Sequence, residues 1–509
     1  MSTENPSPPE AADLKWYQGI TRYQWLVLLI ASLGWVFDVF EGQIFVASMN
    51  DAMPKLIQGD SPIAVSADDK RVLAWNDHAL GSFLLGGAFG GVLFGMLSDR
   101  IGRSKTMIVT ILFYSLFTCV TALAQEPWHM VALRFFVAMG VGGEWAVASA
   151  MVAEVMPSRS RSRMSSIFHA SSIFGTLLAT AAGAFLIGNP EVLNFTQQIA
   201  KTVEPLLGDG SKVAKAITMI LESGWRIGFA IGALPALLTV WIRWKLREPE
   251  QWVKAREKAQ ADASQQTGRL SELFSGVNLR NTIVGVSLAS IGLVTFWGGH
   301  IYGKNALLRH AQAEARVAEG ISAPPKDATD EQKAEHKLVV QAAYKKHGPA
   351  IKQAEMLSMM LNTIGGGLGL VLFGMISERM GRRGAFMMYH GVAFIMMIVM
   401  FEVLIKHNAS AMVLALTLPV FGFFTLGMHA GYAVYFPELY PTRLRGTGAG
   451  FCFNMGRLAT AAAFFGFGAL PATLSPSPED KAMILAPLYL VGVFILLFAK
   501  ETRGEELPE

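Results

Sequence analysis

Long apolar runs separated by short polar loops dominate the hydropathy pattern of this 509-residue chain. About 20 consecutive apolar residues allow a helix to cross the roughly 30 Å hydrocarbon core of a membrane. Twelve such runs occur, at residues 25–48, 77–98, 105–124, 129–151, 164–188, 224–246, 279–302, 353–377, 384–406, 409–433, 447–470 and 481–499. The pattern therefore predicts an all-α membrane protein with twelve spans, and the even number places both termini on one side.

The basic residues of the short loops orient these spans. Four loops on one side carry 11 Lys and Arg residues together, and three loops on the other side carry one. The basic loops are 99–105, 154–163, 378–383 and 438–445, and the opposite loops are 125–128, 406–410 and 471–480. Because Lys and Arg are enriched in cytoplasmic loops, both termini are expected in the cytoplasm. The predicted location is the plasma membrane, which is the inner membrane in a Gram-negative cell.

Longer polar segments divide the chain. The predicted parts are a cytoplasmic tail at 1–24, a six-helix bundle at 25–246, a cytoplasmic linker at 247–278, a second six-helix bundle at 279–499 and a tail at 500–509. Residues 1–24 lack the basic opening of a secretory signal. The extracytoplasmic insertion 303–350 is expected to form one or two solvated helices interrupted at Pro324-Pro325. It is interpreted as a surface cap, with a substrate-capturing lid as the alternative.

Composition agrees with a membrane protein. Hydrophobic residues make up 52% of the chain and charged residues 16%, against about 25% charged in soluble domains. This composition excludes a disordered chain, a disulfide scaffold and a nucleic-acid binder. Cys119 and Cys452 lie inside apolar runs, which argues against a structural disulfide. No nucleotide-binding loop, nucleophile elbow or metal-ligand spacing occurs, so we expect no enzyme activity, cofactor or metal.

Two motifs occur twice in the same order. Residues 95–105 (GMLSDRIGRSK) match 374–384 (GMISERMGRRG), and residues 154–161 (EVMPSRSR) match 438–445 (ELYPTRLR). Two matches at nearly equal offsets of 279 and 284 residues indicate a duplicated six-helix unit. Ordinary basic loops are the alternative, but they do not account for the repeated Gly, Pro and acidic positions.

The repeated motifs predict a charge network on the cytoplasmic side. Their acidic and basic residues can pair between adjacent loops, and their glycines allow close helix approach. The predicted gating residues are Gly95, Asp99, Arg100, Gly102, Arg103, Glu154 and Arg161 in the first copy, and Gly374, Glu378, Arg379, Gly381, Arg382, Glu438, Arg443 and Arg445 in the second.

On these motifs the chain resembles the major facilitator superfamily over residues 20–503. The Arg134-x5-G-x-G-G-E pattern, E-x-x-P-x-R-x-R and the ending AKETRGEEL (499–507) resemble the sugar porters and related metabolite–proton symporters. Asp38-x-x-Glu41 is similar to the paired acids of aromatic-acid, sialate and monocarboxylate symporters. The resemblance implies alternating access between two helical bundles. Span seven lacks the Gln-Gln and Asn pattern of sugar porters, which argues against a sugar substrate.

Ionisable residues inside a membrane are costly and mark functional sites. At 1.5 Å per residue, Asp38 lies about 20 Å and Arg134 about 21 Å from the cytoplasmic side, so we predict that they pair. The resemblance agrees, since the matching pair couples protons in sugar porters; a static ion pair is the alternative. Glu41 shares a helix face with Asp38 and is expected either to join proton loading or to line a wetted vestibule.

Further polar residues within the spans are candidates for substrate binding. They are Arg457, Asn454, Glu144, Asn362, His429 and Tyr432. In the second copy of the repeat, Leu418 corresponds to Arg134 and Met428 to Glu144, so the fold itself does not require those charges. Arg457 suits a carboxylate, because a guanidinium binds it in a bidentate manner; its alternative is a structural pair with Glu144. His300, like His169, is interpreted as a hydrogen-bonded packing residue.

The leading hypothesis is a proton-coupled symporter of a small organic anion. The alternatives are a proton-coupled sugar porter and, with less support, a transporter-like nutrient sensor. The expected partners are the substrate, protons and the lipid bilayer, with no nucleic acid, and the protein is expected to work as a monomer.

Overall fold

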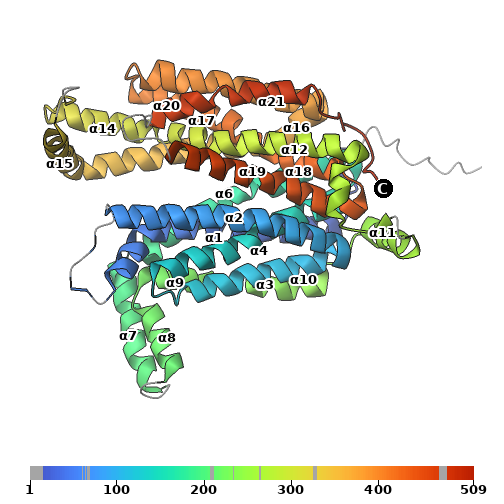
Figure 1. Cartoon of the computed structure of the whole chain (residues 1–509), viewed down its shortest axis with the longest axis horizontal. Coiled ribbons are helices and arrows are strands. Elements are labelled where there is room, and N and C mark those ends of the chain that lie inside the picture. Colours follow the sequence, from blue (N-terminus) through green and yellow to red (C-terminus); the bar gives the residue numbers. More distant parts are fainter. Residues whose placement is uncertain are drawn as a thin grey trace, which may run out of the picture. The chain divides into compact units, whose positions relative to one another are not determined.

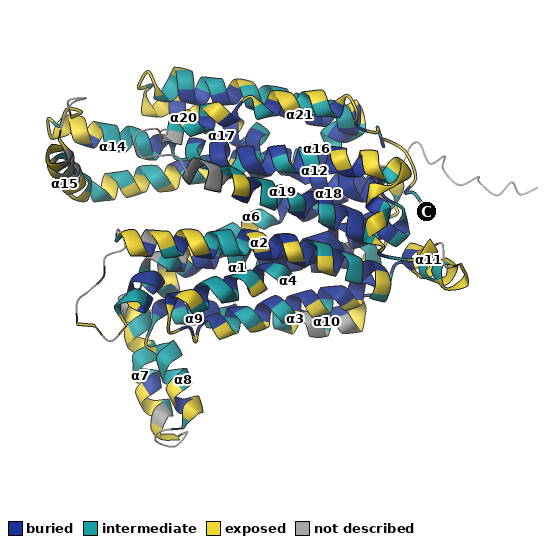
Figure 2. Ribbon diagram, in the orientation of Figure 1, coloured by how far each residue is buried: buried dark blue, intermediate teal, exposed yellow. Residues whose placement is uncertain are grey.

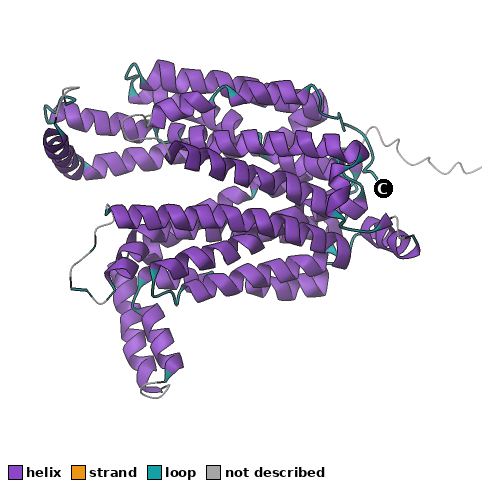
Figure 3. Cartoon of the chain, viewed as in Figure 1, coloured by secondary structure: helices purple, strands orange, loops and turns teal. Residues whose placement is uncertain are grey.

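The computed structural model describes residues 15–509, except for gaps at 60, 63–64, 66–68, 188, 207–210, 233, 263–264, 325–328 and 469–477. The described residues form helices and loops and no strand (Figure 3). The all-α prediction is therefore confirmed. The predicted tail 1–24 and the predicted loop 471–480 lie mostly outside the described residues, and Pro325 lies outside them entirely. The chain forms two compact units, residues 1–279, 433–451 and 502–509, and residues 280–432 and 452–501.

The first unit contains the helices of the N-terminal half (Figure 1). They are α1 (Arg22–Gln58), α2 (Lys70–Ile101), α3 (Arg103–Thr121), α4 (Pro127–Val155), α5 (Ser158–Ala170), α6 (Ser172–Ala182), η1 (Gly183–Ile187), α7 (Pro190–Leu206), α8 (Lys212–Leu221), α9 (Gly224–Ile231), α10 (Ala236–Lys245), α11 (Glu250–Ala261), η3 (Leu270–Phe274) and η6 (Thr442–Leu444). α1 starts at a capping box, in which Thr21 accepts from the Gln24 amide and Gln24 accepts from the Thr21 amide.

Three helices cross the boundary between the units, and the others below belong to the second. The crossing helices are α12 (Gly276–Thr295), α18 (Ala430–Glu438) and α19 (Arg445–Gly468). The second unit adds η4 (Phe296–His300), α13 (Ile301–Gly303), α14 (Ala306–Ala318), α15 (Asp330–Lys346), α16 (Gly348–Ile398), η5 (Val399–Ile405), α17 (Ala411–Gly427), α20 (Pro478–Leu485) and α21 (Leu488–Leu496). α16 breaks at Gly381, whose φ of 81° is not helical.

Within each unit, glycines let two helices pack in direct contact, and the corresponding pair of helices does so in both units. In the first unit, Gly86 and Gly90 of α2 lie against the carbonyls of Phe135 and Met139 of α4, where a Cβ has no room. In the second unit, Gly365 and Gly369 of α16 lie against the carbonyls of residues 419 and 423 of α17 in the same way. The offsets between these pairs are the 279 and 284 residues of the sequence motifs. The predicted duplication is therefore also present in three dimensions.

Many long helices carry exposed residues along their length (Figure 2), and large apolar residues are among them. Phe89 of α2, Leu116 of α3 and Leu416 of α17 are 60% or more exposed, as expected where lipid is the solvent. In the described part of the chain, seven helical segments are long and apolar enough to cross a membrane, and one bent pair would make eight. The segments are Arg22–Val46, Lys70–Ile101, Arg103–Thr121, Pro127–Val155, Gly276–Ala318, Gly348–Ile405 and Ala411–Glu438, with the bent pair Lys212–Leu221 and Gly224–Leu238. Twelve spans remain a prediction.

The predicted polar connections are helical. α7 and α8 form a hairpin that projects from the first unit (Figure 1). The insertion 303–350 contains two helices, α14 and α15, which end and begin on either side of Pro324 as predicted. The linker 247–278 contains α11.

Candidate functional site

Arg103, at the start of α3, is the centre of a buried charge cluster in the first unit. Its guanidinium donates to Asp99 Oδ1 at 2.6 Å, to Glu154 Oε1 at 2.7 Å and to the Thr442 carbonyl at 2.9 Å. Asp99 and Arg103 are fully buried, and Glu154 is 6% exposed. Hydrogen bonds between charged groups are about twice as strong as neutral ones. Three residues that the sequence singled out thus form one network. Together with Arg445 and Thr447 it is called the cytoplasmic cluster below, after the side of the membrane on which the sequence predicts it.

Asp99 also binds the first amides of α19. Its Oδ2 accepts from the Thr447 N–H at 2.7 Å and from the Thr447 hydroxyl at 2.6 Å, and its Oδ1 accepts from the Gly446 N–H at 3.0 Å. A carboxylate suits this position because the first amides of a helix lack acceptors within the helix and carry partial positive charge. Sequence analysis missed Thr447, which stands two residues after the last Arg of its motif.

Arg445 connects the second copy of the E-x-x-P-x-R-x-R motif to the same cluster. It donates to Glu154 Oε1 and to the Thr442 hydroxyl, both at 2.9 Å. It also donates to the carbonyls of Pro437 and Pro508, again at 2.9 Å. The C-terminal tail thus contributes an acceptor to the cluster, which the sequence did not indicate.

Arg161 repeats part of this geometry in the first copy of the motif. Its Nε donates to the Ala153 carbonyl at 3.1 Å, and its Nη2 lies 3.3 Å from the Ser158 hydroxyl. The corresponding partners of Arg445, residues 437 and 442, lie at the same offset of 284 residues. The second Arg of each motif therefore fastens the end of one helix to the start of the next.

A glutamate caps the helix that follows each Gly-rich motif, and the sequence analysis did not single out either as a site residue. Glu248 accepts from the first amide of α3 at 2.6 Å, and Glu501 accepts from the two amides after Gly381 at 2.8 and 3.1 Å. Gly102 and Gly381 have φ of +116° and +81°, which side chains other than glycine rarely adopt. The sequence did contain a signal for these two caps, because each glutamate stands just after the end of a predicted bundle. Glu248 precedes Pro249, and Glu501 precedes Thr502.

The remaining residues of the predicted gating motif have the following exposures and partners. Arg100 is exposed and donates to the Gly268 carbonyl at 3.4 Å. Arg379 is also exposed, and Glu378 is half-buried. Glu438 accepts from the Thr502 hydroxyl at 2.5 Å, and Arg443 forms a salt bridge with Glu272. Ser98 and Ser377 each donate back to the motif glycine carbonyl, Gly95 or Gly374.

A second buried cluster of the first unit contains the predicted proton-coupling residues, and it corrects their pairing. Arg134 forms its salt bridge with Glu41, whereas the sequence predicted Asp38. Glu41 Oε1 also accepts from the Thr118 hydroxyl at 3.1 Å. Asp38 and Glu41 lie about one turn apart on α1, so height in the membrane could not choose between them. The choice depends on the direction in which each side chain leaves the helix axis, about 100° per residue.

Aromatic rings surround the Arg134 guanidinium. Phe45 and Phe229 lie 5.2 Å and Phe83 lies 5.9 Å from its central carbon. Arg134 is fully buried, and among the described residues its Nε and Nη1 have no hydrogen-bond partner. Cation–π contacts partly replace the missing acceptors. The group therefore retains donors for which a second anion can compete.

Glu144, a predicted substrate ligand, lies in the interior of the first unit. It is fully buried on α4, and the Thr110 hydroxyl of α3 lies 2.5 Å from its Oε2. Asp38 is 1% exposed on α1. Arg134, Glu41, Asp38 and Glu144 are called the membrane cluster below.

In the second unit, the predicted ligand Asn362 belongs to a buried hydrogen-bonded group. Its Nδ2 lies 3.2 Å from His300 Nε2, and His300 Nδ1 lies 2.7 Å from the Thr425 hydroxyl. The His300 ring stacks between Phe296 and Phe421, with centroids 4.9 and 5.9 Å away. His300 is hydrogen-bonded and packed, as expected, but sequence analysis did not connect it with Asn362.

The other predicted ligands of this unit follow a row of aromatic rings. His429 contacts Phe296 at 5.1 Å and Tyr432 at 5.4 Å between centroids. Tyr432 lies 6.1 Å from Phe453, and the Arg457 guanidinium lies 5.7 Å from the same ring. Asn362, His429, Tyr432 and Asn454 are buried, and Arg457 is half-buried. The structure therefore groups five of the six predicted substrate ligands in the second unit.

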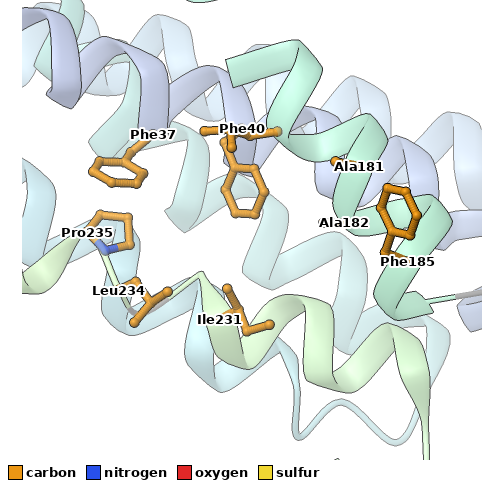
Figure 4. A pocket seen from close by; sticks show the side chains of 9 residues that line it. Phe37, Phe40, Ala181, Ala182, Phe185, Ile231, Leu234 and Pro235 are labelled. Carbon is orange, nitrogen blue, oxygen red and sulfur yellow. The ribbon is translucent and has the colours of Figure 1, made fainter. Parts of the chain in front are cut away.

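A cavity of about 360 Å³ in the first unit holds none of these residues. Figure 4 shows Phe37 and Phe40 of α1 facing Ile231, Leu234 and Pro235, with Ala181, Ala182 and Phe185 beside them. Its lining is apolar, so it offers no recognition of a polar substrate. Among the described residues, no three His, Cys, Asp or Glu side chains are grouped to hold a metal ion.

Comparison with known proteins identifies related transporters. The family described as sugar (and other) transporter matches residues 66–276 and 348–509. A cis,cis-muconate transport protein of Acinetobacter baylyi is 25% identical, over 83% of this chain and 85% of that protein. The niacin transporter NiaP of the same organism is 24% identical, over 96% of each.

Solved structures agree in fold. The proton:xylose symporter XylE, from E. coli, aligns with a TM-score of 0.64 and 16% identity, covering 95% of this chain and 98% of that chain. XylE is a major facilitator superfamily protein. The major facilitator fold that the motifs predicted is therefore confirmed.

Proposed function

This chain belongs to the sugar (and other) transporter family, and we propose that it is a proton-coupled symporter that carries a small organic anion by alternating access. Family membership confirms the prediction of a membrane transporter rather than an enzyme. The proton as coupling ion, the negative charge of the substrate and the roles of individual residues are the proposed part.

The salt bridge between Arg134 and Glu41 is the observation that carries proton coupling. The two side chains are buried between α1 and α4, and the carboxyl of Asp38 lies one turn away on α1. A proton that binds Glu41 or Asp38 removes negative charge beside Arg134, and the guanidinium then favours another anion. Proton binding and anion binding are thereby linked, because each changes the free energy of the other.

Two features support an organic anion as substrate. Arg457 is a half-buried guanidinium on α19 beside an aromatic ring, an arrangement suited to a planar carboxylate. The relatives named above transport cis,cis-muconate and niacin, which both carry carboxylates at neutral pH. In this proposal Asn362, His429, Tyr432 and Asn454 give polar contacts, and the aromatic row gives apolar contact.

The cytoplasmic cluster serves as the gate in this proposal. Asp99 binds the start of α19 in one conformation, and that contact breaks once in each transport cycle. Both termini then face the cytoplasm, the protein resides in the plasma membrane, and a monomer is sufficient for transport.

Uptake into proteoliposomes tests the proposal. The purified chain is reconstituted, and counterflow of labelled cis,cis-muconate, nicotinate and D-xylose is measured with and without an inward proton gradient. We expect exchange of at least one of the acids and its accumulation only with the gradient. The matched control is Lys406→Ala, which removes an exposed ion pair with Glu402. A preference for D-xylose, or accumulation without a proton gradient, would contradict the proposal.

A further inference from the structure

Glu144 is a buried carboxyl group in an environment that does not favour its ionised form. It is 0% exposed, and within the described part of the chain it takes part in no salt bridge. The hydrogen-bond partner of its Oε2 is a neutral hydroxyl group, that of Thr110. Burying an ionised carboxylate without a cation is very costly, and such groups commonly bind a proton instead.

The hydrogen atoms around Thr110 fit a protonated Glu144. The single hydroxyl hydrogen of Thr110 has three oxygen atoms within reach: Glu144 Oε2 at 2.5 Å, the Thr106 carbonyl at 3.1 Å and the Met107 carbonyl at 3.0 Å. A carbonyl only accepts. The Glu144 contact and a carbonyl contact are satisfied together when Glu144 donates a hydrogen to Thr110 and Thr110 donates its own to a backbone carbonyl.

The other carboxyl oxygen of Glu144, Oε1, lies beside Gly34 of α1, where no side chain is present. A Cβ on Gly34 would lie 2.8 Å from Glu144 Oε1, so the missing side chain leaves room for the acid. Asp38 follows Gly34 by four residues and Glu41 follows Asp38 by three, which places them on the same side of α1. The axial steps are about 6 Å and 4.5 Å. Three carboxyl groups are therefore arranged in a row beside α1.

Tyr114 lies one turn after Thr110 on α3, where its Cβ packs against Gly140 of α4. It is fully buried, and among the described residues its hydroxyl has no hydrogen-bond partner, so it is free to bond a carboxyl group of the row. A phenol hydroxyl both donates and accepts a hydrogen bond. Among the described residues, Arg134 precedes Glu144 by ten residues on α4, and the Nδ1 of His169 on α5 accepts from the indole of Trp145, the residue after Glu144.

We propose that Glu144 is a proton-holding residue that exchanges its proton with Asp38 and Glu41 through the Tyr114 hydroxyl. In one transfer, the Tyr114 oxygen accepts a proton from the Asp38 carboxyl while the Tyr114 hydrogen passes to the Glu144 carboxylate. Asp38 becomes ionised, Glu144 becomes neutral and Tyr114 is unchanged. Glu144 is thereby assigned to the proton rather than to the substrate. This inference rests on the proposed proton coupling and extends it by about three helical turns towards the cytoplasm, counted from Arg134 to Glu144.

Infrared difference spectroscopy tests the inference without a substrate. The full chain in lipid is taken from high to low pH, and the carbonyl-stretch band of protonated carboxylic acids is recorded. We expect Glu144→Gln to remove one band, and Thr110→Val to shift the same band because its hydrogen-bond acceptor is lost. Thr180→Val is the matched control, since its hydroxyl bonds only within α6 at an exposed position; it should leave the band unchanged.

Uptake of labelled cis,cis-muconate, or of nicotinate if only that acid is transported, under a proton gradient gives the second measurement. We expect Glu144→Gln and Tyr114→Phe to lose gradient-driven accumulation, which Thr180→Val retains. An unchanged carbonyl band together with normal accumulation in Glu144→Gln would overturn this inference and leave the proposed symport intact. If the unsubstituted protein accumulates no acid under the gradient, the proposed function fails instead. Absence of the Glu144 band then overturns the proton-holding role as well, and its presence supports that role independently of transport.

Discussion

The two buried charge clusters of the first unit differ in how completely their hydrogen bonds are formed. In the cytoplasmic cluster, Arg103 donates from Nε and both Nη atoms, and Asp99 accepts from Arg103, Gly446 and Thr447. In the membrane cluster, Arg134 donates from Nη2 alone among the described residues. Both arginines are fully buried, so burial does not explain the difference.

The difference distinguishes a network whose hydrogen bonds are all formed from a network whose pairing can still change. A buried polar group without a partner costs about 1–3 kcal/mol, so evolution rarely retains one without use. The complete network around Arg103 suits a gate that holds one conformation until all its bonds break together. The incomplete network around Arg134 suits a site at which a proton or a substrate anion changes the pairing.

Loss of the Arg134 charge is expected to have the largest effect. Arg134→Gln leaves Glu41 buried without its cation, and breaking a buried pair in this way costs about 3–5 kcal/mol. We expect a marked decrease in thermal stability and no gradient-driven uptake. The double variant Glu41→Gln/Arg134→Gln should recover most of the stability but not the uptake. Equal stability of Arg134→Gln and the unsubstituted protein would show that the pair is not the electrostatic centre of the cluster.

Asp38→Asn is expected to separate exchange from accumulation. The amide keeps the size of the side chain but cannot bind the coupling proton. Counterflow of the labelled acid should continue, and accumulation driven by a pH gradient should be lost. Both are measured in the same proteoliposomes. Normal gradient-driven uptake by this variant would remove Asp38 from the proton pathway.

Asp99→Asn is expected to weaken the complete network by an intermediate amount. Asp99 is fully buried, so the contact is stronger than a surface pair, and the loss of an ionic acceptor costs about 1–3 kcal/mol. The population should shift towards the inward-facing state. The measurement is labelling of Asn454→Cys by a membrane-impermeant reagent from each side. Accessibility that does not change on either side would exclude Asp99 from the gate.

The two capping glutamates should give the smallest effect and nearly the same one. Glu248→Gln and Glu501→Gln each keep a helix cap but remove its charge, and replacing a cap costs about 0.5–2 kcal/mol at most. Thermal unfolding of each variant measures the effect. Similar decreases would extend the duplication to these caps, whereas a large effect at one position alone would show that the two units use them differently.

Much of the fold was predictable from the sequence for a physical reason. In lipid every backbone amide must bond within its own segment, so apolar length alone indicates helices. The repeated motifs likewise predicted the duplicated geometry, in which glycines of α2 and α16 at equal offsets meet equivalent backbone carbonyls of α4 and α17. The high cost of buried charge made Asp38, Glu41, Arg134 and Glu144 candidate site residues from the sequence alone, and the structure buries all four.

The choice of partners came only from the tertiary structure. Arg134 forms a salt bridge with Glu41, whereas the sequence predicted a pair with Asp38, because the directions in which side chains leave α1 follow only from the packed structure. Asp99 accepts a hydrogen bond from the Thr447 amide, 348 residues later in the chain. No local sequence pattern indicates this pairing. Apolar periodicity and buried charge are properties of single segments and can be read from a sequence, whereas hydrogen-bond partners depend on the rotation and packing of several helices at once.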